Sequence, residues 1–154
     1  MADLIKLADL IERYRTNGIN FGTRGNAPEA VWIQMAEKRL GRLLPPSFKW
    51  FLNNYGGGEV CGEEVYSIYG PDFENAVGGD VVFQYLAHQQ SKTLQADEIP
   101  VAQNDFGEIY YMKSMPLIDD EYRVWVKRGK TAQVYADSFS DFLEKRVKEL
   151  CGVS

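Results

Sequence analysis

Hydrophobic residues recur at helical spacing in the first third of the chain. Within residues 3–15 the apolar positions follow Leu4 by three, four, seven and ten residues, which forms one stripe of a helix: Leu7, Ala8, Ile11 and Tyr14. Pro28 and the Leu-Pro-Pro-Ser run at 44–47 predict the starts of two more helices. Gly41 ends one and the three glycines at 56–58 end the other, because glycine readily adopts the left-handed conformation of a helix end.

After residue 60 the pattern changes to short runs of β-branched and aromatic residues, which predict strands. The predicted strands cover residues 65–69, 99–102, 109–112, 122–127 and 133–136. A helix interrupts them over 80–91, and a last helix begins at Ser138, where Asp141 completes a capping box. Strands joined by hairpins indicate an α+β fold, with one antiparallel sheet of about four to six strands flanked by N-terminal helices, one inserted helix and a C-terminal helix.

The composition, 45% hydrophobic and 25% charged, is that of a folded protein. No long linker divides the chain, so we expect residues 1–154 to form a single domain. The net charge of −5 argues against a general nucleic-acid binder, because such proteins need a basic surface. The chain has no apolar run long enough to cross a membrane and no signal peptide at its start. We therefore expect a cytoplasmic protein with no direct nucleic-acid or membrane partner.

Few residues suggest catalysis. His88 is the only histidine, and its spacing from Val81 and Tyr85 places it beside the apolar face of its helix, which favours a structural role. The glycines at 56–58 follow a helix and lack the lysine of a phosphate loop, and the adjacent Glu59 would repel phosphate. An enzyme built on adjacent carboxylates stays an open alternative. The sequence has three such groups: residues 63–64, 97–98 and 119–121.

Cys61 and Cys151 are the only cysteines, and they lie ninety positions apart. With a single histidine they match no zinc-ligand spacing, so we expect neither a metal nor another cofactor. Free thiols in a reducing compartment are the simpler interpretation, and one disulfide in a secreted protein is the alternative.

Charge is distributed unevenly along the chain. Residues 1–50 and 122–154 each carry a net charge of +3, whereas residues 51–121 hold thirteen acids against Lys92 and Lys113, a net charge of −11. Solvated loops that collect acids are one explanation, and an acidic docking surface with aromatic anchors is the other. The contact residues expected for such a surface are acids and aromatics of this segment: Glu59, Glu63, Glu64, Tyr66, Tyr69, Asp72, Phe73, Glu74, Asp119, Asp120 and Glu121.

Three sequence blocks give the chain a family resemblance. Residues 44–52 read Leu-Pro-Pro-Ser-Phe-Lys-Trp-Phe-Leu, followed by Asn-Tyr-Gly-Gly at 54–57. Residues 99–102 read Ile-Pro-Val-Ala, followed by a polar turn, Gly107 and an aromatic strand, with Glu108 where aspartate is usual. Val-Trp at 124–125 and Ser-Phe-Ser-Asp-Phe-Leu at 138–143 complete the pattern. In this order the blocks, within about residues 27–150, resemble the SUKH superfamily, which contains the yeast cell-wall assembly regulators of Smi/Knr type and many bacterial immunity proteins.

The resemblance implies a twisted antiparallel sheet with surrounding helices and a role in protein binding without catalysis. Bacterial members typically neutralise a cognate polymorphic toxin, often a nuclease. The leading hypothesis is therefore an intracellular immunity protein whose partner is a toxin with a basic surface. The alternative is a regulatory or scaffold module that recruits cellular proteins. Reversing Glu63, Glu64, Asp119 and Asp120 to lysine is expected to weaken binding and leave the fold intact.

Overall fold

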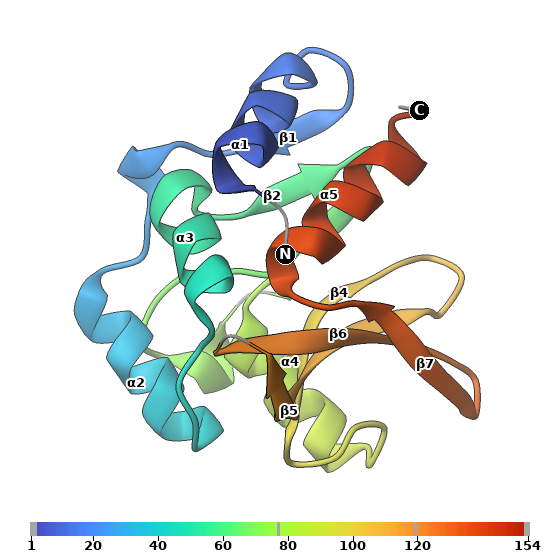
Figure 1. Cartoon of the computed structure of the whole chain (residues 1–154). Helices are drawn as coiled ribbons and strands as arrows, with labels where there is room; N and C mark the ends of the chain where they lie inside the picture. Colours follow the sequence, from blue (N-terminus) through green and yellow to red (C-terminus); the bar gives the residue numbers. More distant parts are fainter. Residues whose placement is uncertain (1–2, 77, 119, 153–154) are drawn as a thin grey trace.

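The computed structural model describes residues 3–76, 78–118 and 120–152, and within them five α-helices and seven strands (Figure 1). The helices are α1 (Leu4–Arg13), α2 (Ala30–Leu40), α3 (Pro46–Tyr55), α4 (Val81–Gln90) and α5 (Phe139–Leu150). The strands are β1 (Ile19–Phe21), β2 (Gly58–Val60), β3 (Glu63–Val65), β4 (Glu98–Gln103), β5 (Ile109–Ile118), β6 (Glu121–Arg128) and β7 (Thr131–Ala136). Two short 3-10 turns, Arg24–Asn26 and Phe73–Asn75, lie between them.

The strands of the described residues form one open sheet in which each strand pairs antiparallel with its neighbour along the chain. This confirms the predicted α+β class, but the expected four to six strands were too few. The first three strands have only three residues each, too short to show an alternating pattern. The predicted strand at 65–69 was placed too late, because β3 ends at Val65.

Local sequence signals explain where the helices begin and end. Gly41 ends α2 with φ +75° and Gly56 ends α3 with φ +69°, both in the left-handed region that favours glycine. The buried Asp80 carboxylate accepts hydrogen bonds from the backbone N–H groups of residues 82 and 83, both at 2.9 Å, and so caps α4. Ser138 caps α5 by accepting from the Asp141 N–H at 3.1 Å, as the capping-box pattern predicted.

Two neighbouring tyrosines of β5 lie on opposite faces of the sheet. The Tyr110 ring lies 5.4 Å from the Phe142 ring of α5, inside the larger hydrophobic cluster that α1 and α3 also join. Tyr111 points the other way and packs with Leu94, which follows α4, and with Ile109. Figure 1 shows the result: α1, α3 and α5 gather on one side of the long strands, and α4 lies on the other side.

A buried ion pair joins α5 to β3, one of the three short strands. The Arg146 guanidinium donates to both Glu63 oxygens of β3, at 2.8 and 2.6 Å, and to Glu149 at 3.0 Å. It also lies 4.8 Å from the centre of the Tyr110 ring, so one side chain connects α5, β3 and β5. Burial opposes the charged form of Arg146, but Glu63 and, after it, Tyr135 and Tyr110 together outweigh burial and raise the pKa of Arg146.

A second buried carboxylate joins β6 to two helix starts. Glu121 accepts from the Ser47 N–H at 2.9 Å and from the Ser47 hydroxyl at 2.6 Å, in the first turn of α3. The same hydroxyl oxygen accepts from the Ser140 N–H of α5 at 3.2 Å. Burial raises the pKa of Glu121, and the two bonds from Ser47 oppose that shift. The N-terminal end of a helix also favours a negative charge at this place.

The Arg146 contacts generate a stability prediction. We expect Arg146→Met to lower the free energy of unfolding by about 3–5 kcal/mol, because Glu63 would be left buried without a partner. Lys148→Met is the matched control on the same helix, since Lys148 pairs with Glu144 at the surface. We expect the control to change stability by no more than about 0.5 kcal/mol in urea denaturation. Equal, small effects in both variants would contradict the role given to Arg146.

Candidate functional site

An acidic row lies on the outward face of the first three strands. Glu59 of β2 stands directly opposite Glu64 of β3, and Asn20 of β1 stands opposite Glu59. Val60 and Val65, one residue further along these strands, are buried in the main core. Because side chains alternate along a strand, the acidic row points away from α5.

The two carboxylates of this row repel one another. Glu59 is exposed and Glu64 is half-buried. Burial raises the pKa of Glu64, and the neighbouring charge of Glu59 raises it further. Within the described part of the chain, neither carboxylate forms an ion pair with a lysine or arginine. Like charges directly opposite in an antiparallel pair are destabilising, so a cationic group brought to this row would relieve the repulsion.

An exposed aromatic ring extends the row. Tyr69 is 44% exposed, although burial, and then the charges of Glu64 and Asp80, raise its pKa. A Cβ at Gly57 would overlap the Tyr69 hydroxyl, and a Cβ at Gly79 would overlap the Glu64 carboxylate. Both side chains therefore rest on glycine backbone. We call Glu59, Glu64 and Tyr69 the acidic face.

Four of the predicted contact residues are buried and make their contacts inside the chain: Glu63, Tyr66, Phe73 and Glu121. Glu63 pairs with Arg146, and Glu121 accepts from Ser47. Burial, and then the charge of Glu64, raise the pKa of Tyr66 to about 12. The expectation that Glu63 can be reversed without harming the fold is wrong, because lysine there would face the buried Arg146.

Three further predicted residues, Asp72, Glu74 and Asp120, do not join the acidic face. Asp72 accepts from the Asn75 side chain at 3.1 Å, and Glu74 pairs with Arg39 of α2 at 2.6 Å. Asp120 is exposed in the β5–β6 turn, beside Glu121. Because Glu121 is linked through Ser47 to Ser140, Asp120 lies near the start of α5, whereas β3 contacts Arg146 in the second half of α5. Along the helix axis these places are roughly 10 Å apart at about 1.5 Å per residue. Asp119 lies outside the described residues.

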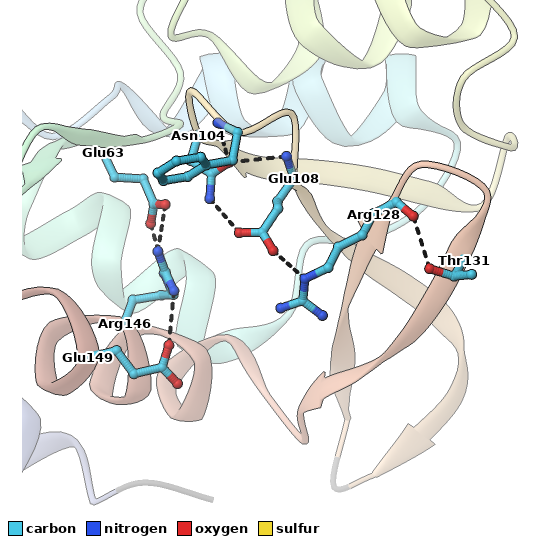
Figure 2. A network of polar contacts seen from close by, with 8 residues as sticks. Glu63, Asn104, Glu108, Arg128, Thr131, Arg146 and Glu149 are labelled. Carbon is cyan, nitrogen blue, oxygen red and sulfur yellow. Dashed lines mark hydrogen bonds and ion pairs between the residues drawn. The ribbon is translucent and has the colours of Figure 1, made fainter.

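The sequence analysis missed the most exposed large hydrophobic side chain in the described part of the chain, Phe106, at 90% exposure. It lies in the β4–β5 loop, where the Asn104 side-chain oxygen accepts from the N–H groups of Phe106 and Glu108, both at 3.1 Å. Figure 2 shows the Glu108 carboxylate held between Asn104, at 2.7 Å, and Arg128. The loop therefore holds its aromatic residue in a well-bonded frame. An aromatic at the centre of an Asn-Asp-Phe-Gly turn was the signal that could have found it.

The structure assigns the other candidate residues to the scaffold. His88 is buried, as its spacing predicted, and burial together with the charge of Lys127 lowers its pKa. Gly56 ends α3, but Gly58 already belongs to β2. Over residues 3–76, 78–118 and 120–152, no three His, Cys, Asp or Glu side chains are grouped to hold a metal ion. No helix in the same residues is long and apolar enough to span a membrane.

The pair on the acidic face generates a prediction about protonation. Glu59→Gln should lower the pKa of Glu64 towards its ordinary value of 4.5, because one of the two causes of its rise is removed. In the wild-type protein the folded state holds the Glu64 proton more tightly than the unfolded chain does. Stability is therefore lost as the pH rises from 4.5 through the raised pKa, and Glu59→Gln reduces that loss. Carboxyl NMR titration measures the shift, and Glu74→Gln is the control. An unchanged Glu64 pKa would show that Glu59 does not act on it.

Comparisons with known proteins agree with this architecture. A crystal structure of a protein from Pseudomonas syringae pv. tomato superimposes with a TM-score of 0.57 at 16% sequence identity, over 89% of this chain and 95% of that chain. At this identity the likeness concerns the fold. None of the curated proteins searched matches the chain. The family model described as SUKH_6, SMI1-KNR4 cell-wall, matches residues 31–143, more than two thirds of the chain. The chain therefore belongs to the SUKH family of SMI1-KNR4 cell-wall type.

Proposed function

We propose that this protein is a non-enzymatic immunity protein that binds a cognate polymorphic toxin through the acidic face. The family to which the chain belongs includes immunity proteins and is generally non-catalytic. The observation that carries the proposal is the pair formed by Glu59 and Glu64, two opposed carboxylates that pair with no lysine or arginine among the described residues, beside the exposed ring of Tyr69. Together they offer charge and an aromatic anchor on one outward surface.

A toxin with a basic surface would gain from both features. Lysine or arginine placed between Glu59 and Glu64 would replace repulsion by attraction. Nucleases carry basic clefts for their phosphate substrates, so a nuclease toxin is the partner that this chemistry suits best. Electrostatic steering raises the association rate by about 10- to 1,000-fold and weakens with salt, because the Debye length is about 8 Å at physiological ionic strength.

The test is co-expression with the product of the neighbouring gene, scoring growth and co-purification. We expect the double variant Glu59→Lys and Glu64→Lys to lose protection and to weaken binding by about 100-fold, mainly through the association rate. Asp9→Lys with Glu29→Lys is the matched control, because it changes net charge equally at exposed positions on the N-terminal part of the chain.

Four outcomes decide the proposal. Loss of protection in the acidic-face variant alone supports it. Equal loss in the control would mean that net charge matters and the acidic face does not. If the product of the neighbouring gene is harmless by itself, it is not a toxin, which contradicts the proposed partner. If salt does not change the affinity, the electrostatic recognition is wrong.

The second candidate is a regulatory or scaffold module, and the exposed Phe106 favours it. Phe106 lines a surface cavity with Arg146 and Leu150 of α5, so it lies on the opposite side of the sheet from the acidic face. An exposed aromatic on a hydrogen-bonded loop is a suitable anchor for a partner protein, and a second surface would let one module hold two proteins.

Phe106→Ala tests whether the β4–β5 loop or the acidic face binds the partner. We expect it to change the free energy of unfolding by less than about 0.5 kcal/mol, because the ring makes few contacts within the chain. Under the immunity proposal it leaves growth protection intact. If Phe106→Ala abolishes protection while the acidic-face double variant retains it, the interface lies at the β4–β5 loop and the assignment to the acidic face is wrong.

A further inference from the structure

The two cysteines, far apart in the sequence, meet in space. Cys61 lies in the turn between β2 and β3, and Cys151 directly follows α5. Their sulfur atoms are 3.1 Å apart, and both are free thiols. A disulfide bond is about 2.0 Å long, so only a small displacement separates these thiols from a covalent link.

The surroundings of the pair make room for the sulfur atoms. A Cβ at Gly18 would overlap the Cys61 sulfur and lie 3.4 Å from the Cys151 sulfur. Gly18 also fixes the turn, because its carbonyl accepts from the Cys61 N–H at 2.6 Å. Cys61 itself has φ +47°, a left-handed conformation that disfavours most residues with a side chain. Three segments, the residues around Gly18, the β2–β3 turn and the end of α5, therefore converge on the two sulfur atoms.

A small oxidant can reach Cys61. The Cys61 side chain is exposed and lines a surface cavity of about 240 Å³ together with Gly62, Phe106, Arg146 and Leu150. Cys151 is only partly exposed, and it is the less reactive thiol because burial and the neighbouring Cys61 raise its pKa to about 12. The first attack on an oxidant therefore belongs to Cys61.

We propose that Cys61 and Cys151 form an oxidation-sensitive pair that hydroperoxides convert into an intramolecular disulfide. The Cys61 sulfur attacks the outer oxygen of the hydroperoxide: an S–O bond forms, the O–O bond breaks, and the leaving oxygen takes the Cys61 proton and departs as the alcohol, or as water from hydrogen peroxide. The Cys151 sulfur then attacks the Cys61 sulfenic acid, so that the S–S bond forms and the hydroxyl leaves as water with the Cys151 proton. The two thiols lose two electrons and two protons in total, and the hydroperoxide is reduced.

The disulfide would lock the end of α5 to the edge strands. It would close a loop of about three fifths of the chain and so restrict the unfolded state, the effect from which disulfides gain most of their stabilisation in the chain-entropy model. The link would also hold the β2–β3 turn beside the Arg146–Glu63 pair. This inference does not depend on the proposed function, because its measurements need no partner.

Hydrogen peroxide is the probe, added to the purified full chain. We expect monomeric protein to lose both alkylatable thiols and the mass of two hydrogen atoms, and a peptide containing the Cys61–Cys151 link to appear. We expect the melting temperature to rise by roughly 5–15 °C and to return after reduction with dithiothreitol. Cys151→Ser should leave a Cys61 sulfenic acid that dimedone traps, and Cys61→Ser should keep Cys151 available to alkylation.

Other products would overturn the proposal. Gain of oxygen atoms at Cys61 without a cross-link, or a disulfide-linked dimer in place of the internal link, would show that the two thiols do not react with each other. Because the mass and the linked peptide are measured on the unaltered chain, they decide the question even where a serine variant folds poorly.

Discussion

The structure depends on one buried cation. Three-residue strands cannot form a stable sheet by themselves, and β1, β2 and β3 are all of this length. Arg146 holds them by binding Glu63 with two hydrogen bonds while its guanidinium lies against Tyr110 of the long strand β5. The helix that carries Arg146 also packs its phenylalanines into the main core. The edge strands, and with them the acidic face, are thus positioned by α5.

Contacts of this kind also explain how the acidic segment of residues 51–121 is accommodated in the fold. Several acids of residues 51–121 have partners inside the chain: Glu63 with Arg146, Glu74 with Arg39, Glu108 with Arg128, and Glu121 with Ser47. The three arginines come from the basic N- and C-terminal parts of the sequence. Folding therefore pairs part of the net charge of −11 with cations, and among the described residues the opposed Glu59 and Glu64 of the first strands form no such pair.

The scaffold could be predicted further than the site. Proline and glycine signals around α2 and α3 and the cap at Ser138 act between residues close in sequence, so their patterns can be recognised directly. The short strands β1 and β2 were missed because three residues give no period to measure. Among the proposed contact residues, no sequence pattern separates the outward-facing, half-buried Glu64 from the buried Glu63, since one position along a strand reverses the side-chain direction.

By itself the sequence determined the α+β class, the family resemblance, the helix ends and the uneven charge. Each of these depends on residue type and on spacing over a few positions. Only the tertiary structure decided which acids pair with cations, that the two cysteines are neighbours, and that Phe106 is exposed to solvent. These are contacts between residues twenty to ninety positions apart or statements about exposure. They follow from how α5 crosses the sheet, a packing outcome that no local pattern contains.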